Sequence, residues 1–257
     1  MSASDLFSIA GKTALVTGGT RGIGRMIAEG FVEAGAAVTI SSRKADACAE
    51  VAAELSAKGT CVGIPANLST EAGCRLLAEE MASRIDHLDI LVNNAGATWG
   101  APLAEFDDTA FEKVLALNVK GVFHLTKFLV PLLEAAGTVD EPARVINIGS
   151  IDGIRVPVLE TYAYSASKAA VHQLTRHLAK RLGPTITVNA IAPGPFQSKM
   201  MAATLDAFGE QIAASAPLKR IGRPDDMAGA AIYLSSRAGA FLTGAVIPVD
   251  GGIATTL

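Results

Sequence analysis

Short apolar runs alternate along the chain with longer segments whose apolar residues recur every three or four positions. The first run, TALVT at 13–17, leads through a glycine-rich turn into the helical pattern GRMIAEGFVEAG at 24–35, and this change of period predicts a strand followed by a helix. Six further runs of this kind lie at 37–42, 61–66, 88–95, 143–149, 185–192 and 245–250. Strands that alternate with helices predict right-handed βαβ units and a parallel sheet.

The segments between these runs fit helices. We expect helices at 45–58, 71–85, about 108–136 and about 161–182, and a last helix from Pro224, because proline suits a first helical turn. No linker rich in Pro, Gly or Ser and no low-complexity segment interrupts the series. Residues 1–257 are therefore predicted to form a single α/β domain with a doubly wound, seven-stranded parallel sheet.

Composition narrows the class of partner. Half of the residues are apolar, 18% are charged and the net charge is −3, with no dense block of Lys or Arg. We therefore expect neither nucleic acid nor a membrane as a partner. The amino terminus has no basic region followed by an apolar stretch, and no apolar run is judged long enough to cross a bilayer. We expect a cytoplasmic protein whose surplus apolar surface is covered by subunit contacts.

Three cysteines, Cys48, Cys61 and Cys74, are odd in number and have neither a Cys-x-x-Cys pattern nor a histidine cluster nearby. This pattern is typical of reduced, mostly buried side chains. We expect no metal site.

The turn after the first strand reads TGGTRGIG, with Gly18, Gly22 and Gly24 at the junction with the helix. Glycines there permit a tight turn and let backbone N–H groups approach a pyrophosphate, which the helix N-terminus favours. The alternative is a turn that only caps the helix. Its place at the start of a βαβ series favours phosphate binding.

The end of the second strand carries Arg43, nineteen residues after Gly24, where NAD-binding sheets usually carry Asp or Glu. This chain has Ser41 and Ser42 in place of a carboxylate, which would repel a 2′-phosphate. Arg43 can meet such a phosphate with a planar set of donors, and Arg21 of the glycine turn can approach from the other side. The pattern favours NADP(H) over NAD(H), the alternative being two solvated arginines.

A Tyr-Lys pair lies in the segment ETYAYSASKAA. Tyr162 precedes Lys168 by six residues and Tyr164 by four, and only residues three or four apart share a helix face. A phenol with a pKa near 10 is a poor acid or base at neutral pH unless a cation favours its charged form. Tyr164 is therefore the candidate for chemistry, with packing or substrate contact as the alternative role for Tyr162.

From about Gly11 to Gly252 the chain resembles the short-chain dehydrogenase/reductase family. The resemblance rests on six motifs in order, which are TGGTRGIG, NNAG at 93–96, Asn118 in LNV, Ser150 in INIGS, YSASK at 164–168 and NAIAPG at 189–194. The chain is especially similar to the 3-oxoacyl reductases of the family, including the rhamnolipid-associated type. The resemblance implies a three-layer Rossmann fold, a nicotinamide cofactor, and a homotetramer or homodimer built on the helices that start near 108 and 161.

The resemblance also implies roles for four catalytic residues. Tyr164 would protonate the substrate carbonyl oxygen as hydride arrives, and Ser150 would hold that oxygen by a hydrogen bond. Lys168 would lower the pKa of the tyrosine and bind the nicotinamide ribose, and Asn118 would order a water that passes protons to the lysine. The gap from Ser150 to Tyr164 is one residue longer than usual and the gap to Tyr162 one shorter, so the lysine spacing decides between the tyrosines.

The expected cofactor contacts extend over six segments of the chain. The family often has Asp in place of Asn67 and Thr in place of Ser198, and both residues here keep an acceptor or a hydroxyl. The expected contacts are Gly18, Thr20, Arg21, Gly22, Ile23, Gly24, Ser42, Arg43, Asn67, Leu68, Asn94, Ala95, Gly96, Tyr164, Lys168, Pro193, Gly194, Phe196 and Ser198.

The substrate pocket implied by the resemblance is mostly apolar. Its expected lining residues are Trp99, Ile151, Val156, Leu159, Phe196, Met200 and Met201. Such a lining suits an acyl chain or a ring better than a sugar, and the same residues are just as often ordinary core.

Charged residues bear on whether the substrate is attached to an acidic carrier protein. Asp140 and Glu141, before Ser150, argue against a carrier, while Arg176, Lys180 and Arg181 offer a basic rim. The alternative for these basic residues is interaction with the helix dipole.

The expected function is NADP(H)-dependent hydride transfer between nicotinamide and a ketone or secondary alcohol, with a 3-oxoacyl-type or other apolar ketone as substrate. The alternatives are a dehydrogenase of a sugar, polyol or steroid-like alcohol, and a non-catalytic NADP(H)-binding regulatory protein. The residues leave open the physiological substrate, the reaction direction, the stereochemistry, the carrier protein as a partner, and the choice between dimer and tetramer.

Overall fold

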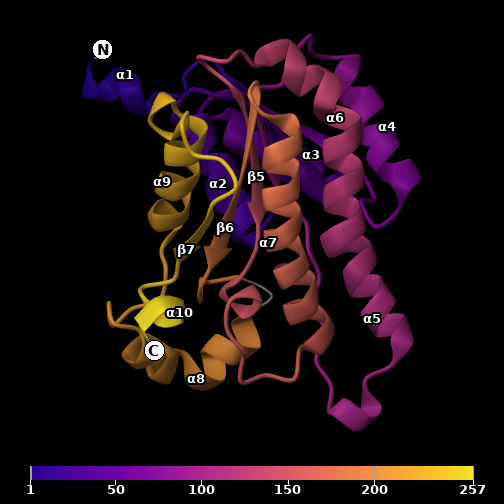
Figure 1. Ribbon diagram of the computed structural model, residues 1–257, viewed down its shortest axis with the longest axis vertical. Helices are drawn as coiled ribbons and strands as arrows, with labels where there is room; N and C mark the ends of the chain where they lie inside the picture. The colour runs from indigo at the N-terminus through magenta and orange to yellow at the C-terminus, as the bar shows by residue number, and fades with distance from the viewer. Residues whose placement is uncertain (1, 199–200, 257) are drawn as a thin grey trace.

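The computed structural model describes residues 2–198 and 201–256, which are built around one parallel β-sheet (Figure 1). The described residues contribute seven strands, β1 (Thr13–Thr17), β2 (Ala37–Ser42), β3 (Cys61–Pro65), β4 (Ile90–Asn93), β5 (Ala143–Ile148), β6 (Ile186–Pro193) and β7 (Val246–Val249). Their order is β3-β2-β1-β4-β5-β6-β7, and all neighbours are parallel. The order reverses between β1 and β4, and ligands of such sheets bind at the carboxyl ends of the strands at that point.

One face of the sheet is covered by α2 (Gly22–Glu33), α3 (Ala45–Ser56) and α9 (Pro224–Ser235). Each helix turns an apolar stripe toward the strands, and Phe31 of α2 is fully buried in the same cluster as Ile40 of β2. Full burial of such a side chain contributes about 1.5–3 kcal/mol.

The other face is covered by α4 (Glu71–Ala82), α6 (Val122–Ala136) and α7 (Tyr162–Leu182), while α5 (Asp108–Leu115) packs on α7. A π-helical segment, Ala116–Gly121, joins α5 to α6 without a break. The two helical layers with the sheet between them form the predicted three-layer Rossmann fold, so the fold class is confirmed.

The helix 108–136 corrects one expectation. Its 29 residues, with a mean hydropathy of 1.2, make it long and apolar enough to pass for a membrane span by length and composition, and the core helix of a soluble protein passes the same test. The run was missed because Lys113, Lys120 and Lys127 interrupt it. In the fold this helix packs on α4, α7 and β5.

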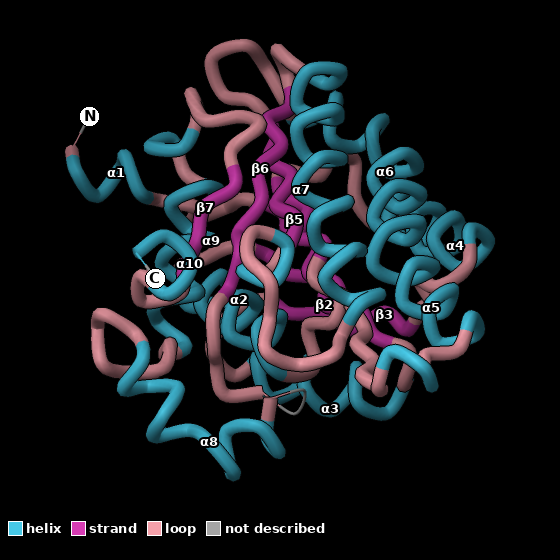
Figure 2. Tube along the Cα trace, turned by 60° about the horizontal axis from the view of Figure 1, so that its bottom comes forward, coloured by secondary structure: helices cyan, strands magenta, loops and turns pink. Residues whose placement is uncertain are grey.

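Short elements lie beyond the carboxyl edge of the sheet, at the bottom of Figure 1. They are the 3₁₀ turns Leu103–Glu105 and Ile151–Gly153, with α8 (Ala202–Ser215) and α10 (Ile253–Thr256). Figure 2 shows α8 standing away from the sheet. The remaining elements are α1 (Ala3–Phe7), at the opposite end of the molecule in Figure 1, and the 3₁₀ turn Arg237–Gly239.

The predicted strands and helices are all present with small shifts at their ends, and α1, α8 and α10 are additional. The strand expected at 88–95 is only Ile90–Asn93, because Asn94 leaves the ladder and bonds to the end of β1. The helix α8 was not predicted, since the segment AATLDAFGEQIAAS buries none of the side chains described in it and so lacks a clear apolar stripe. The three cysteines are free, as expected, and Cys48 and Cys74 are buried.

Candidate active site

The turn between β1 and α2 leaves little room for side chains at its three predicted phosphate-binding glycines. Gly18 has φ +65° and Gly22 has φ +55°, conformations that favour glycine. A Cβ on Gly24 would collide with the carbonyl oxygen of Gly18, so the first turn of α2 packs directly on the end of β1. Around them the side chains of Thr20 and Ile23 are half-buried. This geometry suits a phosphate group, because N–H groups and the helix dipole favour an anion there.

The hydroxyl of Thr17, the last residue of β1, joins this turn to the loop after β4. Its Oγ1 accepts hydrogen bonds from the backbone N–H groups of Asn94 at 2.9 Å and Ala95 at 3.0 Å. The Asn94 amide donates in turn to the carbonyl oxygens of Thr17 at 2.8 Å and Gly18 at 3.3 Å. The predicted residues Asn94 and Ala95 therefore lie beside the glycine turn. Thr17 is missing from the predicted set, and only a polar residue ending a buried strand could have indicated it.

The segment after β6 approaches the same turn. Ser198 lies over Gly22, where an added Cβ would be 3.2 Å from the Ser198 Cβ. Gly194, directly after Pro193, donates its N–H to the carbonyl oxygen of Val249 at 3.0 Å. The structure thus brings Ser198 to the predicted phosphate region.

Phe196 is placed differently from the expectation that its ring contacts the cofactor. The ring is only 1% exposed and lies against Gly222, where a Cβ would collide with it. Its burial follows from the parallel bridge between residues 196 and 222. Phe196 therefore shapes the site from inside the core.

The carboxyl end of β2 carries the residues predicted to select the cofactor. The Oγ of Ser42 is half-buried, 3.2 Å from the Sγ of Cys48, while Arg43 and Arg21 are exposed. Within residues 2–198 and 201–256 neither arginine forms an ion pair. Both guanidinium groups are therefore available to a phosphate.

The loop after β3 carries two predicted cofactor contacts, one of which is exposed and the other buried. Asn67 is exposed, and its Oδ1 accepts from the N–H of Ser69 at 3.3 Å and from its Oγ at 2.8 Å. Leu68 is 6% exposed and belongs to the core beneath α4. The carbonyl oxygen of Leu68 accepts from the Sγ of Cys74 at 3.6 Å and packs against Gly121, and cofactor contact by Asn67 and Leu68 stays a prediction.

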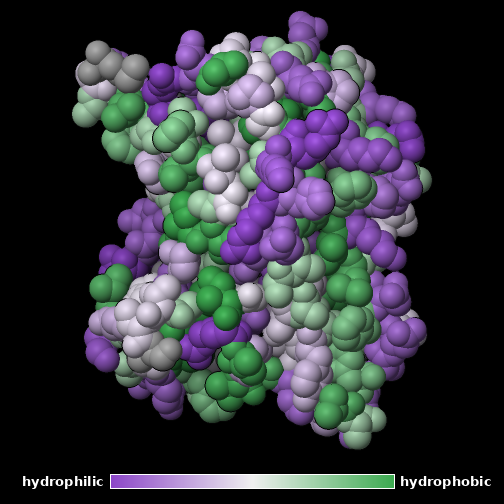
Figure 3. All heavy atoms as spheres, in the orientation of Figure 1, coloured by the Kyte–Doolittle hydropathy of each residue, from purple (hydrophilic) through white to green (hydrophobic). Residues whose placement is uncertain are grey.

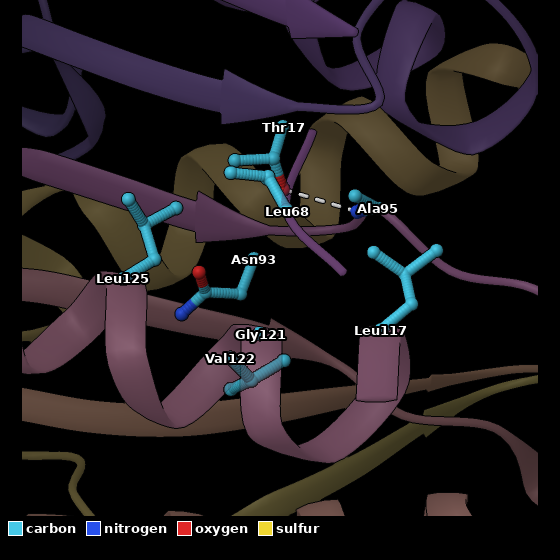
Figure 4. A pocket seen from close by; sticks show the side chains of 8 residues that line it. All are labelled: Thr17, Leu68, Asn93, Ala95, Leu117, Gly121, Val122 and Leu125. Carbon is cyan, nitrogen blue, oxygen red and sulfur yellow. Dashed lines mark hydrogen bonds between the residues drawn. The ribbon is translucent and has the colours of Figure 1, made fainter. Parts of the chain in front are cut away.

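A small cavity separates the end of β4 from the π-helical segment (Figure 4). Its volume is about 10 Å³, which is room for about one water. The lining residues are Thr17, Leu68, Asn93, Ala95, Leu117, Gly121, Val122 and Leu125.

A ladder of buried polar side chains runs from this cavity across the sheet. The Nδ2 of Asn93 donates to the Oγ1 of Thr126 at 3.0 Å and to the Oδ1 of Asn147 at 2.9 Å. The Nδ2 of Asn147 then donates to the Oγ1 of Thr175 at 2.9 Å. The ladder links β4 and β5 to α6 and α7, the helix that carries Tyr164 and Lys168.

Ser150 and Tyr164 meet where β5 ends and α7 begins. Ser150 is 7% exposed, and its Oγ accepts the N–H of Asp152 at 3.1 Å. Burial raises the pKa of Tyr164 to about 12, a hydrogen bond with Ser150 opposes the rise, and the charge of Asp152 adds to it. The two predicted hydroxyls are therefore brought together at the carboxyl edge.

Lys168 does not act on the phenol as expected. Its Nζ donates to the carbonyl oxygen of Ile148 at 2.7 Å and lies 5.4 Å from the centre of the Tyr164 ring. Burial lowers the pKa of Lys168 to about 8, and the charge of Asp152 opposes this. The expectation of a lowered tyrosine pKa is wrong for this structure, because burial penalises the charged forms of both groups.

Asn118 lies in the π-helical segment and is 1% exposed. Its Oδ1 accepts the N–H of Ala97 at 2.8 Å, and its Nδ2 donates to the carbonyl oxygen of Ala97 and to the Oγ of Ser167, both at 2.9 Å. A Cβ on Gly96 would be 3.4 Å from the Asn118 Oδ1 and 3.9 Å from the Lys168 Nζ. Asn118, Gly96 and Lys168 therefore lie together, and the water that Asn118 would order for Lys168 stays a prediction.

Tyr162 points away from this cluster. Its hydroxyl donates to the Oε1 of Glu160 at 2.7 Å, and its ring packs edge-on against Phe106 with 5.5 Å between the ring centres. Of these two tyrosines, Tyr164 is the one that interacts with Ser150.

The predicted apolar lining divides into core and surface. Ile151 is buried with Ala216 and Ile253, whereas Trp99, Val156 and Leu159 are exposed on loops at the carboxyl edge. Met201 is half-buried, and Met200 lies outside the described residues. The exposed members are the surface available to an apolar substrate.

The argument from acidic residues before Ser150 is wrong. Glu141 pairs with Lys12 at 3.1 Å and with Arg144 at 3.1 Å, at the amino end of β5. Six residues of strand, about 20 Å, separate this edge from the carboxyl edge. Neither Asp140 nor Glu141 can therefore repel a carrier at the site.

The basic residues of α7 lie far from the site as well. Arg176 is twelve residues, or about 18 Å along the helix, beyond Tyr164. Figure 3 shows hydrophilic residues gathered over the upper part of α7, on the side away from α8. Arg176, Lys180 and Arg181 therefore do not form a rim of the site.

Comparison with known proteins agrees with this geometry. Residues 18–254 match the family described as enoyl-(acyl carrier protein) reductase. The chain is 54% identical over 250 residues to the rhamnolipids biosynthesis 3-oxoacyl-[acyl-carrier-protein] reductase of Pseudomonas aeruginosa, covering 96% of this chain and 97% of that one. It is 35% identical over 247 residues to the 3-oxoacyl-[acyl-carrier-protein] reductase FabG of Aquifex aeolicus, covering 95% and 97%.

Solved structures of related proteins show a similar fold over nearly the whole chain. The Pseudomonas aeruginosa RhlG/NADP active-site complex has a TM-score of 0.94 and 52% identity, covering 97% of this chain and 99% of that one. A gluconate 5-dehydrogenase from Burkholderia cenocepacia in complex with NADP and tartrate has a TM-score of 0.91 and 32% identity, with 100% of both chains covered. The sheet, the glycine turn and the Ser-Tyr-Lys cluster, together with these likenesses over nearly the whole chain, place this protein in the short-chain dehydrogenase/reductase family.

Proposed function

We propose that the protein is an NADP(H)-dependent reductase of 3-oxoacyl thioesters. The observation that carries the proposal is the contact of Ser150 with Tyr164, beside Lys168, at the edge of the sheet where the glycine turn lies. The 54% identity to a 3-oxoacyl-[acyl-carrier-protein] reductase supports the substrate class.

The residues around the glycine turn fit NADP(H). Side chains are excluded from Gly18 and Gly24, which leaves the backbone open to a pyrophosphate. Arg43 and Arg21 would hold the 2′-phosphate, and Ser198 would approach the phosphates from the opposite side. Lys168 and Asn94 would hold the nicotinamide ribose side. When bound, NADPH supplies the hydride that reduces the carbonyl carbon.

The side chains of the site supply the proton and the stabilising contact. Tyr164, with its raised pKa, is protonated at neutral pH and donates its proton to the carbonyl oxygen. The Ser150 hydroxyl donates a hydrogen bond to the same oxygen, which strengthens as negative charge develops. Lys168 replaces the tyrosine's proton, and Asn118 holds the 97 loop against α7 so that both groups keep their places.

The apolar side chains exposed at the carboxyl edge favour an acyl chain as the substrate's second part. Trp99 is 50% exposed and Leu159 54%, and an acyl chain would remove their surface from water. A sugar would leave this surface without polar partners.

The test is reduction of acetoacetyl coenzyme A, followed by loss of NADPH absorbance. A carrier-bound acetoacetyl thioester, acetoacetate and 5-ketogluconate serve as competing substrates. The proposal predicts turnover of the thioesters at rates well above those of the two free acids. Preference for 5-ketogluconate would instead support the sugar-acid activity named for the Burkholderia cenocepacia neighbour.

The assembly and location of the protein are proposals of the same kind. Phe7, Tyr233 and Phe241 expose aromatic surface at one end of the molecule, and Phe123 does so on α6. These exposed side chains support a homotetramer or homodimer, and the free cysteines support the cytoplasm. Light scattering and cell fractionation test the two proposals.

A further inference from the structure

The turn Ile151–Gly153 carries an acidic residue into the site. Its backbone is fixed on both sides of Asp152, since Gly153 donates its N–H to the carbonyl oxygen of Ser150 at 3.0 Å and the Asp152 N–H donates to the Ser150 Oγ at 3.1 Å. Ile151 is buried in a small apolar cluster with Ala216. The turn that positions Ser150 therefore also fixes Asp152.

The same turn packs directly against the helix of the catalytic pair. A Cβ on Gly153 would be 2.7 Å from the carbonyl carbon of Lys168 and 2.8 Å from the Cε1 of His172. No side chain fits at Gly153 between the turn and α7, so Asp152, one residue earlier, is held beside the helix that carries Tyr164 and Lys168. The Asp152 side chain is half-buried in this contact.

The Asp152 carboxylate has no structural partner of its own. Among the described residues it accepts no hydrogen bond and forms no ion pair within 4.0 Å. A half-buried carboxylate without such contacts is costly, and burial raises its own pKa. Among the described residues the fold thus keeps an acidic group here without a hydrogen bond or ion pair to hold it.

The charged groups that face Asp152 can be named. From α7 these are Tyr164 and Lys168, with His172 against the neighbouring Gly153, and from the following loop Arg155. Burial lowers the pKa of His172 to about 4, so this ring is neutral near pH 7. Arg155 is directed elsewhere, because its Nη1 donates to the carbonyl oxygen of Ile253 at 3.0 Å. The remaining groups are the Tyr164 phenol and the Lys168 ammonium.

We propose that Asp152 is a positioning residue whose charge, set in the turn that holds Ser150, keeps the Tyr164 phenol protonated and so favours carbonyl reduction over alcohol oxidation. The proposal rests on the proposed reductase function. A carboxylate near a phenol disfavours the phenolate, and near an ammonium it favours the charged amine. Both effects keep Tyr164 and Lys168 protonated, and reduction of the carbonyl group requires a proton from this pair.

The sharpest test titrates Tyr164 directly. The chain has three tyrosines, so Tyr162→Phe/Tyr233→Phe leaves Tyr164 as the only one, and ¹³C-labelled tyrosine reports its ionisation by NMR. In this background Asp152→Asn should lower the tyrosine pKa by roughly half a unit or more. Asp152→Glu should leave it nearly unchanged, as should the control Asp86→Asn, an exposed residue before β4. An unchanged titration in Asp152→Asn would overturn the proposal.

Steady-state rates of reduction and oxidation provide an independent test of the role of Asp152. With Asp152→Asn the alkaline limb of the reduction profile should move to lower pH, and oxidation of the corresponding alcohol at pH 7 should rise several-fold relative to reduction. If Asp152→Asn does not fold, Asp152→Ser in the same background gives the titration. Because the titration needs no substrate, a shifted tyrosine pKa without thioester turnover would refute the proposed function and leave the role of Asp152 standing.

Discussion

The Lys168 Nζ lies 5.4 Å from the centre of the Tyr164 ring and donates its hydrogen bond to the carbonyl oxygen of Ile148 instead. The lysine therefore reaches the end of β5, the strand that leads to Ser150, and ties α7 to it. One ammonium group at this place holds the serine and tyrosine segments together before any substrate binds.

The first prediction separates the two neighbouring tyrosines. Tyr164→Phe should lower kcat for acetoacetyl coenzyme A by about 10²–10⁴, because the proton donor is lost. Tyr162→Phe, the matched control on the same helix, should keep nearly full activity, since its hydroxyl contacts only Glu160. Steady-state rates with NADPH measure both. Equal losses in two folded variants would contradict the assignment of Tyr164.

The second prediction concerns cofactor choice. One or two charge-assisted contacts from Arg43 and Arg21 should favour NADPH over NADH by on the order of tenfold to a few thousandfold in kcat/KM. Ser42→Asp/Arg43→Ala should reverse the preference, because the new carboxylate repels the phosphate and accepts from the ribose hydroxyls. Lys44→Ala, at an exposed neighbour, is the control. Equal use of both cofactors by the wild type would show that neither Arg43 nor Arg21 binds the 2′-phosphate of NADPH.

The third prediction concerns acid stability. His172 has a folded pKa near 4 against an ordinary value of 6.5, so the unfolded chain binds more protons between these values. Stability should therefore fall as the pH falls from 6.5 to 4, by about 1.4 kcal/mol for each unit of pKa difference. His172→Gln should flatten this part of the curve. His177→Gln, exposed on the same helix, should not. Urea unfolding at several pH values measures the slopes.

The fourth prediction concerns the buried polar ladder. Asn147→Ala removes the partners of both Asn93 and Thr175 and should lower the free energy of unfolding by about 2–3 kcal/mol. Asn93→Ala together with Asn147→Ala should cost clearly less than the sum of the single changes, because the shared hydrogen bond is lost once. Denaturant unfolding of the three variants checks this. Additive losses would mean that the two amides do not cooperate.

Local spacing was enough to predict the parts of the site that lie on one element. The four-residue spacing from Tyr164 to Lys168 predicts a shared helix face, and the glycine turn follows from its place between a strand and a helix. The fold class likewise followed from the alternation of apolar runs. These inferences need only the periods of the strand and the helix.

Contacts between different helices, strands and loops could not be predicted from the sequence. The link from Thr17 to the loop after β4 spans 77 residues, and the place of Asp152 depends on how its turn packs on α7. The error over Glu141 has the same origin. Glu141 is close to Ser150 along the chain, yet the strand between them carries the two residues to opposite edges of the sheet.

The helix α8 buries none of its described side chains, while the adjacent Ala216 is fully buried. Its amides should therefore exchange with solvent through local opening that leaves the sheet intact, long before those of α7. Substitutions of the exposed side chains of α8 should then leave the packing of the sheet and the catalytic cluster unchanged.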